Sequence, residues 1–369
     1  MEGGHLLGQG SYGCAFTPPL LCKSRPKSYG KVGKITIKED ATHEIAIANR
    51  LRKMPLHRHF FLLADPESCE PLPIPLQKDK EIKDCDATTR DDEYKVQWSQ
   101  TRQLFLPFGG KNPLGNMIME SNLHPKFFPF FDFMRHVLEA GSTLLLAGVC
   151  HYDLHPNNFI QDPYGVVRIL DFGQSFTVNS IDDETMRWKQ LFFGFEKDGP
   201  HPMIPNAEPP EITVLNAKRN GYSLESAIAN TLKGKQIFQD MQRILGMTLG
   251  GLRDEMDDFF ATSMSVTKND WIEFYKLYWT GFDAWAIGSL CLTVLKYQMS
   301  WVEFVNGDWK QRKGMTLLAL RGLLHPNPRK RLDCIEALFL FDPANSWIQK
   351  FGKPWIEKRK LLRKRLEKN

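Results

Sequence analysis

The stretch His151-Tyr-Asp-Leu-His-Pro-Asn-Asn158, followed by Asp171-Phe-Gly173, is the most informative part of this chain of 369 residues. The first segment places an Asp and an Asn five residues apart, in a predicted loop after a helix. Asp171 comes 18 residues after Asp153, at the end of the apolar run 166–170, which predicts a short strand. The pattern H-x-D-x-x-x-x-N … D-F-G supplies a carboxylate for an attacking hydroxyl and two oxygen ligands for Mg²⁺. A chance match of both motifs is the alternative.

A glycine-rich stretch lies close to the start of the chain and is followed by the small apolar residue Ala15. Glycines permit a sharp turn and let backbone N–H groups approach phosphates closely. Because the stretch precedes a predicted strand, residues 31–37, instead of opening a helix, it favours a flap over a nucleotide and not a dinucleotide-binding crossover. A glycine-rich hairpin without a ligand is the alternative. The stretch consists of Gly8, Gln9, Gly10, Ser11, Tyr12 and Gly13.

A lysine that binds phosphate is expected on the strand 31–37, paired with a glutamate on the next helix. Lys34 and Lys38 are the two candidates, and Glu44 opens the predicted helix 44–51. Lys38 lies only six residues before Glu44, which leaves little chain between strand and helix. We therefore favour Lys34, while either lysine could instead be a solvated strand residue.

Three further motifs follow in the chain, and with them the sequence resembles eukaryotic-type protein kinases over about residues 3–345. Pro209-Pro-Glu211 is similar to the A-P-E that closes the activation segment, and Asp283-Ala-Trp-Ala-Ile-Gly288 is similar to D-x-W-x-x-G. Asn327-Pro-Arg-Lys-Arg331 is similar to D-P-x-x-R. The resemblance implies a buried ion pair between Glu211 and Arg331, and a structural role for Asp283.

The resemblance implies an α+β, two-lobed protein-kinase-like fold, with a small antiparallel-sheet lobe and a larger, mainly helical lobe. We expect the first lobe at residues 1–108, with an inserted loop at about 64–92 and a strand at 93–98. The second lobe is expected at 109–350, with a helical insertion at about 212–270, and a basic tail at 351–369.

The resemblance also implies ATP and Mg²⁺ as cofactors and serine or threonine hydroxyls of proteins as substrates. The flap, Ala15 and Lys34 are expected to bind ATP, with Leu106 and Phe108 beside the adenine. Glu44 would hold Lys34, Asp153 would act on the substrate hydroxyl, and Asp171 and Asn158 would bind the metal. Structural roles are expected for His151, Phe172 and Gly173.

Two departures from the family pattern lie in the loop 151–158. Tyr152 replaces an Arg that commonly binds an activation-loop phosphate, so we expect the segment to be ordered by its own packing, through Trp188, Phe192 and Phe193. Arg168 or Arg187 could instead replace the missing Arg. His155 replaces the usual Lys, and D-L-H-P-x-N loops also occur in aminoglycoside- and choline-kinase-like phosphotransferases. A small-molecule phosphotransferase and a pseudokinase scaffold are therefore the alternative interpretations.

Composition predicts a globular chain in a reducing compartment. The seven cysteines are odd in number and scattered, and none forms C-x-x-C, which favours free thiols. The start lacks a signal-peptide pattern, and no apolar run reaches membrane-spanning length. Several short motifs resemble the divergent kinases of large cytoplasmic DNA viruses, which implies the host cytoplasm or the virion. The tail from residue 351 has eight Lys and Arg against two Glu and could contact an acidic partner, nucleic acid or a membrane surface.

Overall fold

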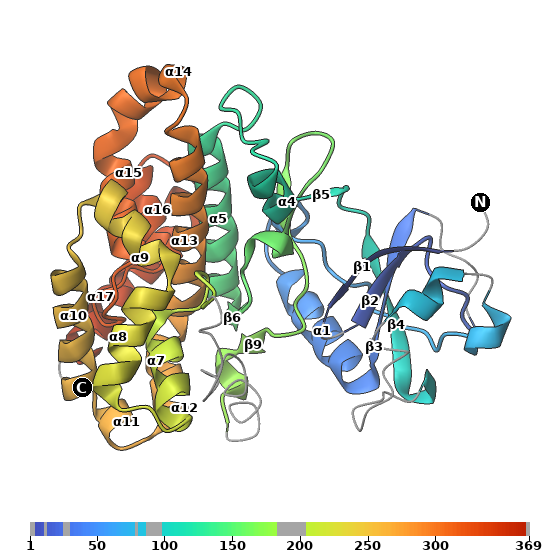
Figure 1. The fold of residues 1–369 in the computed structure, drawn as a ribbon. Helices are drawn as coiled ribbons and strands as arrows, with labels where there is room; N and C mark the ends of the chain where they lie inside the picture. The colour runs from blue at the N-terminus through green and yellow to red at the C-terminus, as the bar shows by residue number, and fades with distance from the viewer. Residues whose placement is uncertain are drawn as a thin grey trace. The chain divides into compact units, whose positions relative to one another are not determined.

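The computed structural model describes residues 4–10, 13–24, 30–77, 80–85, 98–182 and 204–366 (Figure 1). The architecture is mixed α+β, with a small antiparallel four-stranded sheet near the N-terminus and a larger, mostly helical part. Internal contacts divide the chain into two units. The first contains Met1–Lys111 and Ile160–Ser175, and the second contains Asn112–Phe159 and Phe176–Asn369. The segment that carries Asp171 therefore groups with the N-terminal sheet, and the first unit extends beyond the expected boundary at residue 108.

The first unit is organised by a sheet in which each strand pairs with its neighbour in the chain, in the order β1-β2-β3-β4. Its strands are β1 (His5–Gly10), β2 (Gly13–Thr17), β3 (Lys31–Ile37) and β4 (Thr101–Pro107). The expected strand at 31–37 is confirmed as β3. The other elements are α1 (Lys38–Leu51), α2 (His57–Phe60), η1 (Ile74–Leu76), η2 (Lys80–Asp84), η3 (Trp98–Gln100), β7 (Phe159–Gln161) and β8 (Val167–Ile169).

The two faces of this sheet carry separate apolar clusters, because side chains alternate along each strand. On one face, Leu104 and Leu106 of β4 pack with Ala41 of α1 and with Ala64. On the other face, Cys14, Phe16, Leu20 and Ile35 pack with Ile82 and Cys85 from the expected loop at 64–92. Ile82 and Cys85 of that loop therefore cover this second face, while Ala64 at its start packs on the first. The strand expected at 93–98 lies outside the described residues, except for Trp98, which begins η3.

The expectation of free thiols throughout the chain is wrong. Cys14 forms a disulfide with Cys85, and Cys22 forms one with Cys69, both within the first unit. The paired residues lie 71 and 47 positions apart in the sequence, so no short spacing motif indicates them. The other three cysteines, Cys150, Cys291 and Cys334, form no disulfide in the structure and are buried in the second unit.

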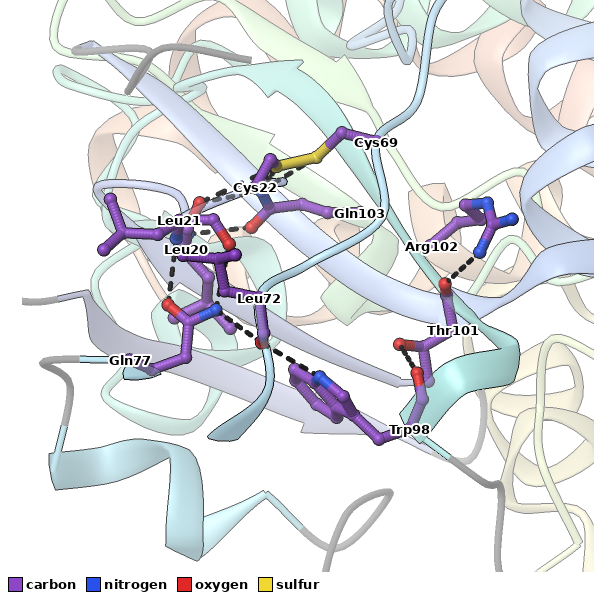
Figure 2. Close-up of a disulfide and its surroundings, with 10 residues drawn as sticks. All are labelled: Leu20, Leu21, Cys22, Cys69, Leu72, Gln77, Trp98, Thr101, Arg102 and Gln103. Carbon is purple, nitrogen blue, oxygen red and sulfur yellow. Dashed lines mark hydrogen bonds between the residues drawn. A yellow bond between two sulfur atoms is a disulfide. The ribbon is translucent and has the colours of Figure 1, made fainter. Parts of the chain in front are cut away.

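Figure 2 shows how a buried glutamine ties the second disulfide to β4. The side chain of Gln103 accepts from the N–H of Leu20 at 2.8 Å and donates to its carbonyl oxygen at 3.0 Å. The same amide nitrogen lies 3.1 Å from Sγ of Cys22. The backbone of Gln103 exchanges two hydrogen bonds with Cys69, at 2.8 and 3.0 Å. The chain around the disulfide is thus fixed on both sides of the sulfur atoms.

The second unit is mostly helical and is built around two long buried helices, α5 (Phe130–Ala147) and α13 (Phe282–Gln298). The helical character expected at 212–270 is confirmed. The other helices that we name are α4 (Leu114–Met119), α7 (Pro210–Arg219), α8 (Leu224–Gly234), α9 (Gln236–Asp240), α10 (Leu249–Thr262), α11 (Met264–Thr267), α12 (Trp271–Tyr278), α14 (Val302–Phe304), α15 (Lys310–Leu323), α16 (Cys334–Phe341) and α17 (Lys353–Leu366).

Short elements connect these helices. The strands are β5 (Asn112–Pro113), β6 (Val149–Cys150) and β9 (Phe176–Thr177), of which β6 and β9 pair antiparallel. The 3-10 turns are η4 (Pro156–Asn158), η5 (Val178–Ser180) and η7 (Trp279–Gly281). The π-helical turns are η6 (Met241–Leu245), η8 (Val305–Trp309) and η9 (Ile348–Gly352). No helix among the described residues combines the length and the apolar character needed to cross a membrane.

The basic tail forms α17 and is held to the second unit by polar contacts. Trp355 donates its indole N–H to Oδ2 of Asp333 at 2.8 Å, and Arg363 donates to both carboxylate oxygens of Glu336 at 2.8 and 2.7 Å. Leu361, which a packed apolar face would bury, is 64% exposed. Charged and aromatic side chains thus anchor the tail.

Candidate functional site

Lys34, Glu44 and Asp171 meet within the first unit. Nζ of Lys34 lies 2.7 Å from Oε2 of Glu44 and 2.6 Å from Oδ1 of Asp171. Lys34 comes from β3, Glu44 from the next helix α1, and Asp171 from the chain that follows β8. Lys38, the rejected candidate, is the first residue of α1 and is exposed.

The charge of this cluster is set by burial and by the carboxylates. Burial alone would lower the pKa of Lys34, but Glu44 and Asp171 outweigh it and raise the pKa above its ordinary value. Burial raises the pKa of Glu44, and the ammonium of Lys34 opposes that shift. With all three groups ionised, two negative charges face one positive charge. The excess negative charge and the carboxylate oxygens fit a hard cation such as Mg²⁺.

The glycine-rich strands lie beside this cluster in the sheet. Ala15 is the register partner of Lys34, and Gly8 is the partner of Ala15. Gly13 has φ +140°, and a Cβ there would lie 1.8 Å from the carbonyl oxygen of Ile35, so only glycine fits. Ser11 and Tyr12 lie outside the described residues.

The two residues expected beside the adenine lie at the end of β4 and just after it. Leu106 is the register partner of Val32, two residues from Lys34 on the same sheet face, and is 8% exposed. Phe108 follows β4 and is 40% exposed. The structure thus places Leu106, more clearly than Phe108, on the same sheet face as Lys34.

Asp153, His155 and Asn158 meet in the second unit. The amide nitrogen of Asn158 donates to the backbone carbonyl of Asp153 at 2.7 Å and lies 3.3 Å from its Oδ2. Because these bonds use the nitrogen, they present the amide oxygen, which is the atom that Mg²⁺ prefers, for coordination. The amide oxygen of Asn158 is therefore oriented as a metal ligand would be.

His155 has a defined tautomer. Its Nδ1 accepts from the N–H of Asn157 at 3.3 Å, so the proton of the neutral ring lies on Nε2. That Nε2 lies 3.7 Å from Oδ2 of Asp153. A neutral His155 therefore offers one N–H close to the carboxylate.

Tyr152 has an unusual backbone conformation, with φ +68°. Bulky residues rarely adopt the left-handed region, and such strain persists only where the surroundings enforce it. Asp283 provides that support, because its carboxylate accepts from the N–H of His151 at 2.7 Å and of Tyr152 at 2.9 Å. Burial raises the pKa of Asp283 to about 6, and these hydrogen bonds oppose the shift. The expected structural roles of Asp283 and the fully buried His151 rest on these contacts.

The side chain of Tyr152 lies in an aromatic cluster. Its ring centroid is 5.6 Å from that of Phe176 in β9 and 5.8 Å from that of Phe282 in α13. Its hydroxyl is 2.7 Å from the hydroxyl of Tyr275 in α12. Ring contacts and one hydroxyl pair thus surround the side chain of Tyr152.

The predicted ion pair between Glu211 and Arg331 is present. Two parallel hydrogen bonds of 2.7 Å join the guanidinium to the carboxylate, and both side chains are 0% exposed. Arg331 also lies over the ring of Trp285, 5.0 Å from its centroid. A planar, bidentate contact of this kind needs arginine specifically.

The remaining predicted residues have definite places. Phe172 is buried and packs edge-on against Phe61, with ring centroids 5.8 Å apart. The N–H of Gly173 lies 3.4 Å from Oδ1 of Asp171. Sequence reasoning missed the buried Lys235, because one lysine in a polar segment gives no sign of burial.

A scan against protein-family models and a search of curated proteins find no match to this chain.

Proposed function

We propose that the chain is an ATP- and Mg²⁺-dependent protein kinase, with a two-lobed protein-kinase-like fold, that phosphorylates serine and threonine hydroxyls. The observation that carries the proposal is the contact of Lys34 with both Glu44 and Asp171. Asp171 lies 137 residues from Lys34 in the sequence, and the three residues match the lysine, the helix glutamate and the D-F-G aspartate of kinases.

Each residue of the site has a proposed task. Lys34 would bind the phosphate oxygens of ATP, and Glu44 would keep its ammonium in place. Asp171 and the amide oxygen of Asn158 would hold Mg²⁺, which supplies positive charge to the phosphates when it is bound. Asp153 would orient the substrate hydroxyl and take its proton on the carboxylate.

His155 is the observation that favours a second candidate, a small-molecule phosphotransferase. Its Nε2 lies 3.7 Å from Oδ2 of Asp153 and offers one N–H donor at a position where protein kinases have a mobile ammonium. We rank the protein kinase first because the Glu211–Arg331 pair and the Asp283 contacts accompany the site. A viral kinase acting in the host cell is part of the proposal, with the sequence motifs as its support.

The test is incubation of the protein with radiolabelled ATP and Mg²⁺. One arm offers a casein-like protein mixture, and the other offers aminoglycosides and choline. We expect label on protein, found as phosphoserine or phosphothreonine after hydrolysis. Label on the small molecules would support the second candidate, and ATP binding without transfer would indicate a pseudokinase scaffold.

Matched variants connect the activity to the site. Asp153→Ala and Asp171→Ala should each abolish transfer, and only Asp171→Ala should weaken Mg²⁺-dependent ATP binding. Asp132→Ala is the control, because Asp132 is 65% exposed and pairs with Arg135 on α5. Wild-type activity in both site variants would refute the assignment of this loop.

A further inference from the structure

We propose that Lys235 is a positioning residue that fixes residues 204–208, the end of the activation segment, and so replaces a phosphate on that segment. The inference rests on the proposed function, which makes these residues part of an activation segment. Residues 204–208 lie immediately before the Pro209-Pro-Glu211 motif, and Lys235 lies at the junction of α8 and α9 in the insertion.

The ammonium of Lys235 binds the segment through its backbone. Nζ donates to the carbonyl oxygen of Pro205 at 2.5 Å and to that of Glu208 at 2.7 Å. The side chain is 0% exposed. A buried ammonium without partners is costly, so these carbonyls are partners that the folded chain cannot easily lose.

A second set of contacts holds the middle of the segment. The side-chain oxygen of Asn206 accepts from the N–H of Ile237 at 3.0 Å, and its carbonyl accepts from the indole of Trp285 at 2.9 Å. Ile204 lies against Gly234, where an added Cβ would meet its Cδ1 at 2.7 Å. The insertion and α13 therefore fix the segment at several points around Lys235.

Glu208 supplies a negative charge in the same buried region as the ammonium of Lys235. Its carboxylate accepts from the hydroxyl of Thr213 at 2.5 Å and lies 3.5 Å from the amide nitrogen of Asn216. Burial raises the pKa of Glu208 and lowers the pKa of Lys235, while each group opposes the shift of the other. The cation is thus an internal part of the fold.

A phosphate orders such a segment by pairing with Arg or Lys side chains, whereas Lys235 holds the segment directly through its backbone carbonyls, so no phosphate is needed to tether it. Tyr152 is used in the aromatic cluster, and Arg168 is held by Asp162 at 2.5 Å and by the carbonyl of Arg58 at 2.9 Å. In the described part of the chain, the cation that contacts residues 204–208 is Lys235. The aromatic residues first expected to order the segment, and Arg187, lie outside the described residues.

Hydrogen exchange of the full chain tests this directly, because it needs no catalytic activity. The backbone N–H groups of residues 204 and 206–208 are followed by mass spectrometry before and after phosphatase treatment, since Pro205 has none. We expect slow exchange in both wild-type samples. Lys235→Met, and the charge-neutral pair Lys235→Met with Glu208→Gln, should speed exchange there about tenfold or more and leave α5 protected. The double variant avoids an uncompensated buried carboxylate.

Lys296→Met is the matched control, because Nζ of Lys296 binds Oδ2 of Asp240 on α9 at 3.1 Å, outside residues 204–208. Its exchange in the segment should equal that of wild type. With a protein substrate, Lys235→Met should raise the substrate KM about fivefold or more and change the ATP KM less than about twofold.

Unchanged exchange in both Lys235 variants would overturn the inference, and so would release of the segment by phosphatase alone. An inactive wild type with the expected exchange pattern would instead refute the kinase proposal and leave Lys235 as the residue that fixes this segment.

Discussion

Lys34 is the residue at which the proposed chemistry is easiest to separate from stability. Lys34→Met should lower phosphoryl transfer by more than about 100-fold, because the phosphates lose a preorganised cation. Lys38→Met should retain most activity, since Lys38 is exposed at the start of α1. Transfer assays on both variants, at saturating ATP, check this. Loss of activity in Lys38→Met alone would mean that the strand register is shifted by four residues.

Glu211 tests the buried ion pair. Glu211→Gln should lower the free energy of unfolding by about 3–5 kcal/mol, because the guanidinium of Arg331 is left buried and uncompensated. The pair Lys330–Glu255 is the control, because it is partly exposed, and Glu255→Gln should cost less than about 1 kcal/mol. Urea denaturation measures both. Equal, small losses would show that the buried pair adds nothing beyond a surface contact.

At the scale of elements, sequence patterns predicted some boundaries well and others poorly. The alternation in residues 31–37 predicted β3, whose bounds match. The start of α1 was placed at Glu44, but the helix begins at Lys38 because the chain passes from β3 into α1 without a loop. The argument against Lys38 therefore assumed a connection between β3 and α1 that the structure does not have. The choice of Lys34 nevertheless agrees with its contacts. The contacts of Lys235 could not be predicted, because they depend on tertiary packing.

The turn between α15 and α16 should make stability depend on pH. Burial lowers the pKa of His325 to about 4, and the positive charges of Arg331 and Lys330 act in the same direction. The neutral ring accepts from the N–H of Asn327 at 3.2 Å. A lowered pKa means that the unfolded chain binds a proton first, so stability is lost as pH falls from about 6.5 to about 4.

His325→Asn isolates this contribution, because an Asn oxygen can accept the same backbone N–H without titrating. We expect the free energy of unfolding to fall by about 2 kcal/mol less in the variant than in wild type over that pH range. Urea denaturation at pH values of about 4.5, 5.5 and 6.5, which lie between the folded and unfolded pKa values of His325, measures the difference. Parallel pH curves for the two proteins would show that His325 does not titrate differently on folding.

At the scale of the whole molecule, the four disulfide cysteines lie in the first unit and the three cysteines without a disulfide lie in the second. Composition suggested free thiols because it counts cysteines without knowing which strands bring them together. Disulfides persist in oxidising surroundings, so the pairs argue against a strictly reducing location for the folded protein. The cytoplasmic location therefore stays a prediction, and the state of the cysteines in the native protein becomes the informative measurement.

The disulfide Cys14–Cys85 closes a loop of 71 residues in sequence and joins β2 to the chain that covers the far face of the sheet. Removing it with Cys14→Ala and Cys85→Ala should lower the free energy of unfolding of the first unit by about 2–4 kcal/mol, because the unfolded chain gains freedom. Reduction of the wild type should have a similar or larger effect. Cys291→Ala is the control, since this buried thiol is unpaired and its variant should remain as sensitive to reductant as wild type. Peptide mapping under non-reducing conditions should recover both cross-linked pairs. Alkylation of all seven cysteines in the denatured, unreduced protein would show instead that the thiols are free, as composition suggested.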